Sequence, residues 1–168
     1  MIFFKSFIIL ILILVCFFVS IRIQAQVDLS GNWLLRRIEA PPGKFYGNGC
    51  PKQIKTDQSA EFVTFEKITD LNGDGRDFIV REKLPLDGRR VESLSGRRKQ
   101  KVMSVSWNQE RTILTEFIFV REPSDTARRL TSTIDQFHID QGLLILERKT
   151  KNYLTGDEWE SRATYVRQ

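Results

Sequence analysis

The stretch from residue 60 to residue 83, AEFVTFEKITDLNGDGRDFIVREK, decides the fold class. Residues 60–68 alternate apolar and polar side chains, which is the pattern of a half-buried β-strand, and residues 77–83 are expected to return as the next strand. An Asn-Gly pair and an Asp-Gly pair lie between them, and these are the strongest short signals for a hairpin turn. The stretch therefore predicts two antiparallel strands joined by a tight turn.

The same unit of strand and turn repeats along the rest of the chain. Seven more strands are expected, over residues 31–38, 89–94, 102–107, 112–121, 128–139, 143–149 and 158–166. Residues 39–58 are rich in Pro and Gly and are expected to form a long loop. Eight or nine strands joined by tight turns predict an all-β antiparallel meander, and closing it into a barrel removes its unpaired edges.

The first 25 residues have the composition of an export signal. Lys5 precedes a continuous apolar run from residue 7 to residue 21, and Ala25 is a small residue at a suitable cleavage site. The run is short for a bilayer span, which needs about 20 apolar residues. We therefore predict a signal peptide over residues 1–25 and one exported domain over residues 26–168, periplasmic or secreted, with no membrane span after cleavage. An uncleaved signal anchor is the alternative, because Arg22 follows the apolar run directly.

The composition of the domain narrows its class of function. The chain has 26 Lys and Arg against 21 Asp and Glu, and Lys5 and Arg22 belong to the signal, so the domain is only mildly basic. Nucleic-acid binding is not expected, since it would need a concentrated basic face. Cys50 is the one cysteine after residue 25, which excludes a disulfide within the domain. A buried small side chain is the expected state of Cys50, and an exposed thiol that pairs with another chain is the alternative.

Three stretches resemble small exported bacterial β-barrel domains of the lipocalin type. They are Leu29-Ser30-Gly31-Asn32-Trp33, which matches the G-x-W opening of lipocalins, VSWN with TILT at 105–108 and 112–115, and DQGLLILER at 140–148 followed by ATYVR at 163–167. The resemblance implies a binding barrel whose tryptophan packs at the closed end under an arginine of the last strand. Trp33, next to the structural Gly31, would be that tryptophan, and Arg162 or Arg167 would be the arginine.

The turn at residues 70–75, DLNGDG, has the opening of a calcium loop. Asp70, Asn72 and Asp74 place oxygen-bearing side chains at alternate positions before a glycine. Arg81 stands where such a loop carries its distal glutamate, so the second half of the pattern is missing. A plain hairpin turn is the first expectation and a calcium site the second, and no other cofactor is expected.

Few residues suggest catalysis. His138 is the only histidine, and the sequence has no phosphate-binding loop and no nucleophile elbow, so no enzyme activity is expected. The basic cluster from Arg89 to Lys101 is expected to be a solvated hairpin rather than a contact for an anionic surface.

The leading hypothesis is an exported binding protein for a small apolar molecule. Five aromatic side chains are the candidates to line its barrel: Phe62, Phe65, Phe78, Phe117 and Phe119. A barrel of this size can instead be filled completely by its own side chains. The alternative function is a non-catalytic protein–protein module of the cell envelope, an inhibitor or accessory subunit. Its contact surface would be the loop 39–58, with Phe45, Tyr46 and Cys50.

Overall fold

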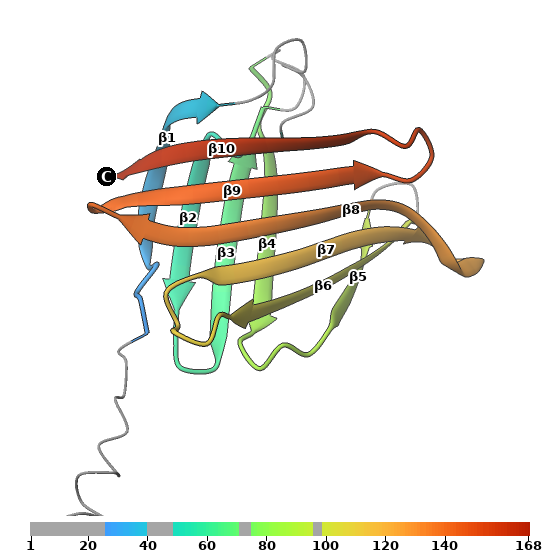
Figure 1. The fold of residues 1–168 in the computed structure, drawn as a ribbon, viewed down its shortest axis with the longest axis horizontal. Helices are drawn as coiled ribbons and strands as arrows, with labels where there is room; N and C mark the ends of the chain where they lie inside the picture. The colour runs from blue at the N-terminus through green and yellow to red at the C-terminus, as the bar shows by residue number, and fades with distance from the viewer. Residues whose placement is uncertain (1–25, 40–48, 71–74, 96–98) are drawn as a thin grey trace, which may run out of the picture.

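A computed structural model describes residues 26–39, 49–70, 75–95 and 99–168, and over these residues it is built from strands alone (Figure 1). No described segment forms a helix that is long and apolar enough to cross a membrane. The strands are β1 (Gly31–Glu39), β2 (Gln53–Gln58), β3 (Phe62–Thr69), β4 (Phe78–Pro85), β5 (Val91–Ser95), β6 (Lys99–Trp107), β7 (Leu114–Glu122), β8 (Asp125–Asp140), β9 (Leu143–Asn152) and β10 (Glu158–Arg167).

The strands form one antiparallel sheet that curls into a nearly closed barrel. Its order is β4-β3-β2-β1-β10-β9-β8-β7-β6-β5, so each strand pairs with its neighbour in sequence and β1 pairs with β10. In Figure 1, β1 to β4 form the rear layer, and β7 to β10 cross in front of them. The barrel is left unbonded at one seam, between the edge strands β4 and β5. The predicted all-β antiparallel meander is confirmed.

The number of strands is ten rather than eight or nine, because β2 lies inside the predicted loop 39–58. Ile54 and Thr56 are buried, whereas Lys55 and Asp57 are exposed, so the strand does alternate. It is only six residues long and follows Gly49 and Pro51 closely, which hid the signal. Register with its neighbours holds it in place, with Trp33 opposite Ile54 and Phe65 opposite Thr56.

One end of the barrel is filled by a hydrophobic core, and we call it the packed end. Its fully buried side chains include Trp33, Leu84, Leu114 and Tyr165. The Tyr165 hydroxyl donates a hydrogen bond to the Pro51 carbonyl at 2.9 Å, which satisfies its buried polar atom. Deeper in the barrel the core ends in a stacked pair of rings, Phe65 and Phe137, with centroids 4.9 Å apart.

Candidate functional site

The packed end is closed by Trp33 and an arginine of the last strand. The Arg167 guanidinium lies 4.9 Å from the centre of the Trp33 ring, in a cation–π contact, and it also donates to the Ser30 carbonyl. Of the two arginines that the resemblance left open, Arg167 lies over Trp33. Arg162 lies on the outside of β10, beside Glu147. A side chain at Gly31 would put its Cβ 2.9 Å from Arg167 Nε, so the close approach needs glycine.

Beyond the phenylalanine pair, the barrel interior holds a layer of charged side chains. Three cations and three carboxylates point inward from six of the strands, and we call them the ion-pair layer: Lys67, Glu82, Lys101, Glu116, Asp135 and Arg148. Their formal charges cancel, which is what a low-dielectric interior requires of buried ions. The layer lies between the packed end and the opposite end of the barrel, and beyond it Ile118 still packs against the core.

Two strong links in the layer bridge the seam. The Lys67 ammonium on β3 lies 3.2 Å from Glu82 and also donates to Glu116 on β7, and the Lys101 ammonium on β6 donates to Glu82 on β4. Backbone ladders do not join β4 to β5, so these side chains tie the two edges of the sheet together. Lys101 therefore belongs to the interior, although it ends the basic cluster that was expected to be solvated.

The second half of the layer is the Arg148–Asp135 pair. Arg148 Nε and Nη2 donate to the two Asp135 oxygens at 2.7 and 2.5 Å, a bidentate geometry, and Nη1 donates to the Gly49 carbonyl. Nearby, Cys50 Sγ lies 3.5 Å from Ser161 Oγ, and both side chains are buried. Cys50 is thus a buried free thiol, as expected. Burial raises its pKa, which makes it a poor nucleophile.

Glu116 is the unusual member of the layer. It is 0% exposed, and burial raises its pKa to about 7 against the opposing pull of Lys67, with Glu82 and Asp135 adding repulsion. The pKa of Glu82 moves the other way, to about 2, because two ammonium groups outweigh its desolvation. Glu82 is therefore ionised at neutral pH, whereas the pKa of Glu116 lies close to neutral pH.

The raised pKa of Glu116 predicts that the free energy of unfolding falls as pH rises through the neutral range. The folded pKa of Glu116 lies above its ordinary value of 4.5, so the folded state holds the proton more tightly than the unfolded chain. Between about pH 5 and pH 8, ionising Glu116 should cost about 2–3 kcal/mol of unfolding free energy. Urea denaturation at both pH values measures the loss, and the Glu116→Gln variant should lose much less. If both proteins lose the same free energy of unfolding, the pH dependence comes from groups other than Glu116.

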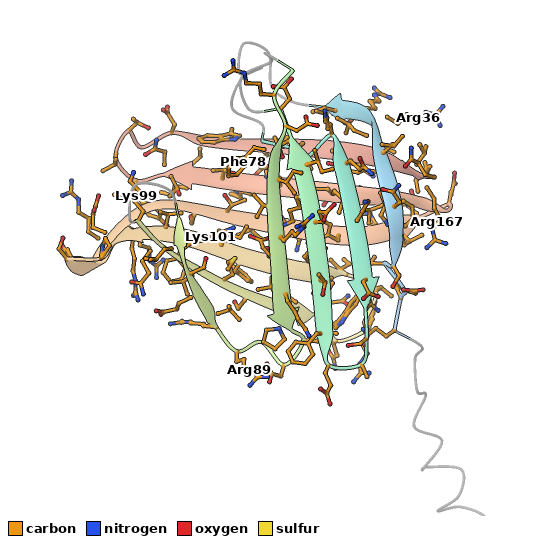
Figure 2. The ribbon with its side chains drawn as sticks, turned by 180° about the vertical axis from the view of Figure 1, so that it is seen from behind. Arg36, Phe78, Arg89, Lys99, Lys101 and Arg167 are labelled. Carbon is orange, nitrogen blue, oxygen red and sulfur yellow. The ribbon has the colours of Figure 1, made fainter. Side chains whose placement is uncertain are left out.

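The end of the barrel beyond the ion-pair layer is built differently, and we call it the Phe78 end. Its inward side chains are mostly half-buried instead of fully buried: Val80, Ile118, Val120, Thr133 and Trp159, with Thr150 at 8% exposure. Thr133 and Thr150 hydroxyls are 3.3 Å apart across β8 and β9. Phe78, on the same face of β4 as Glu82, is 54% exposed at the rim. Figure 2 shows Phe78 and Lys99 toward this end and Arg167 far from it.

The structure corrects three of the five phenylalanines that were predicted to line the barrel. Phe117 and Phe119 alternate with the inward Glu116 and Ile118, so they point outward, and Phe117 is 45% exposed. Phe62 also points outward, with the Lys83 ammonium 4.6 Å from its ring centre. Both parities of these strands carry apolar side chains, so alternation alone could not choose the face. Phe65 is buried inside, and Phe78 lies at the rim.

Other predicted residues lie partly outside the described segments. Asn72 and Asp74 of the calcium loop are among these, and Asp70 accepts a hydrogen bond from the Gly75 amide at 3.0 Å. The calcium site stays a prediction. Phe45 and Tyr46 lie outside as well, as do residues 1–25. In the described part of the contact loop, Cys50 is buried and residues 53–58 are paired in the sheet, and a protein–protein contact through this loop stays a prediction.

Two solvent-open hollows are bounded by described residues. A groove of about 750 Å³ crosses the outer face of β8 to β10, where outward side chains such as Gln136, Glu147 and Glu160 line it. A second hollow of about 800 Å³ lies beside the turns of the packed end, near Arg89 and Trp107. Both are open to solvent and bordered by charged side chains, so an apolar molecule would gain little burial in either.

Comparison with known proteins finds a match in fold among solved structures. No protein-family model and no curated protein matches the chain. Among solved structures, it is similar to the zebrafish ileal bile acid-binding protein complexed with cholic acid, with a TM-score of 0.50, 12% identity, and 83% of this chain and 98% of that chain covered. A fatty-acid-binding protein from Manduca sexta gives a TM-score of 0.46 at 13% identity, over 83% and 99% of the two chains. At this identity the zebrafish likeness shows the barrel fold alone.

The sequence did not suggest the ion-pair layer, although it holds the signal. Lys67 follows Phe65 by two residues, and Glu82 precedes Leu84 by two, so each lies on the same face as a core residue. Reading polar residues as outward and apolar ones as inward discards that information. Charged residues in phase with the core are therefore the pattern that could have identified the layer.

Proposed function

We propose that this protein binds a small apolar molecule inside the barrel, at the Phe78 end. The observation that carries the proposal is the contrast between the two ends. Most inward residues of the packed end are fully buried, whereas most of those beyond the ion-pair layer keep some accessible surface. Apolar groups such as Val80, Ile118 and Val120 would gain from covering that surface with a ligand.

The fold likeness and the chemistry of the interior support a binding role over catalysis. The zebrafish protein of similar fold is described as binding a bile acid. In the described part of this chain, the buried carboxylates are paired with cations, and the thiol of Cys50 has a raised pKa. A protein–protein role through residues 39–58 has less support, since Cys50 is buried and residues 53–58 are strand.

We further propose that the domain acts after export, as a periplasmic or secreted protein. The apolar run over residues 7–21 and Ala25 support this, since they form a typical signal with its cleavage site. N-terminal sequencing of the protein from its own host should read Gln26 first. A chain that begins at Met1 would instead indicate an uncleaved anchor or a cytosolic protein.

Filling the Phe78 end should abolish binding. Ile118→Trp places a large ring inward from the middle of β7, and we expect it to weaken binding of the neutral dye Nile red at least about tenfold, because the added volume occupies the ligand's space. Phe117→Trp is the matched control, since the neighbouring side chain points outward, and it should bind the dye as the native protein does. Fluorescence titration measures both, after melting curves show that both variants are folded.

Two results would count against the interior site. If Ile118→Trp and Phe117→Trp bind Nile red equally, the dye lies elsewhere. If the native domain binds no Nile red at all, the proposed function itself fails.

A further inference from the structure

One oxygen of the buried Glu116 carboxylate has no hydrogen-bond partner. Glu116 Oε2 accepts from the Lys67 ammonium, but Oε1 is buried and meets no donor among the described residues. A buried acceptor without a donor is costly, because water satisfied it in the unfolded chain. The raised pKa of Glu116 is the expected response of a carboxylate in this position.

The cations of the ion-pair layer, in contrast, already have acceptors. Lys67 binds Glu82 and Glu116, and Lys101 binds Glu82. Arg148 donates to both oxygens of Asp135 and to the Gly49 carbonyl. An incoming carboxylate would have to displace one of these internal acceptors and would add a negative charge to a layer whose charges now cancel.

Glu116 is fully buried and lies next to the inward residues of the Phe78 end. It is the inward residue directly before Ile118 on β7, and on β8 its partner Asp135 is followed toward the same end by Thr133. In the proposed site, the ion-pair layer would therefore be the polar floor of a chamber, and Val80, Ile118, Val120 and Thr133 would be its walls. A ligand with an apolar body along these walls presents its polar end to the floor.

From this geometry we infer that the ligand ends in a hydroxyl group, which donates a hydrogen bond to Glu116 Oε1, and that a carboxylate end is disfavoured. The inference rests on the proposed function and narrows it to apolar alcohols. A hydroxyl completes the one acceptor that the layer leaves open and disturbs none of its ion pairs. A hydrogen bond to a charged acceptor is also stronger than a neutral one, so it contributes selectively to such ligands.

The test compares three ligands with the same chain: dodecanol, dodecyl methyl ether and dodecanoate. Each displaces Nile red from the native domain at about pH 8.5, where Glu116 is ionised. We expect dodecanol to bind about tenfold more tightly than the ether, which cannot donate, and more tightly than dodecanoate. In Glu116→Met, which removes both oxygens, the preference for alcohol over ether should fall to about one, and in Glu116→Gln, which keeps a neutral acceptor, it should lie between.

The outcomes separate this inference from the proposed function. If native protein binds dodecanol and the ether equally, or dodecanoate most tightly, the hydroxyl inference is overturned while binding of Nile red leaves the interior site standing. If no ligand and no dye binds, the proposed function has failed first. If Glu116→Met does not fold, the comparison of the three ligands on native protein and on Glu116→Gln still decides.

Discussion

Replacing Lys67 with methionine should lower the free energy of unfolding by about 3–5 kcal/mol, a large part of the 5–15 kcal/mol that holds a typical domain. Lys67 is buried, and it is the only hydrogen-bonded cation of Glu116 among the described residues. Without it, Glu116 stays buried at the centre of the barrel with Asp135 and Glu82 close by. Glu82 keeps Lys101, so the loss comes mainly from Glu116, which takes up a proton and loses its ion pair.

Two further variants isolate that cause. Lys55→Met removes a half-exposed lysine that lies 3.5 Å from Glu66 on the outer face, and it should cost less than about 1 kcal/mol. Adding Glu116→Gln to Lys67→Met should restore part of the lost stability, because it removes the buried carboxyl group that has lost its cation. Urea denaturation of the four proteins gives the comparison. A Lys67→Met variant no weaker than Lys55→Met would show that the layer does not hold the seam.

Trp33→Ala should cost about 3–5 kcal/mol, the range for removing a large aromatic side chain from a core. Trp33 is 2% exposed, its indole donates to the Leu29 carbonyl at 3.0 Å, and its ring carries the Arg167 guanidinium. The substitution empties the packed end and leaves the Leu29 carbonyl without this donor. We expect a melting midpoint lower by many degrees, with the unfolding transition still cooperative.

Trp159→Ala is the matched control, because Trp159 is the half-buried tryptophan of the Phe78 end. It should cost clearly less stability than Trp33→Ala and should instead change the affinity for Nile red. Thermal melting and dye titration of the two variants therefore assign one tryptophan to the fold and the other to the chamber. If Trp159→Ala costs more stability and Trp33→Ala changes the affinity for Nile red, the assignment of the packed end and the Phe78 end is wrong.

The strands and their order could be predicted from turns and alternation, but the contents of the barrel could not. Nine of the ten strands carry a clear pattern, and β2 was missed because a short strand follows Gly49 and Pro51 closely. The faces were harder, since Phe62 and Phe65 lie on opposite sides of one strand, and only closure of the barrel decides which is inside. The pairing of Lys67 with Glu116 joins residues from strands far apart in sequence, so no local pattern indicates it.

The most direct test of binding inside the barrel is to map the bound ligand by amide NMR. The spectrum of the native domain would be recorded with and without saturating Nile red. The largest shifts should fall on inward residues of the Phe78 end, such as Ile118, Thr133 and Thr150. Shifts concentrated on the outer groove at Gln136, Glu147 and Glu160, or an unchanged spectrum, would contradict an interior site.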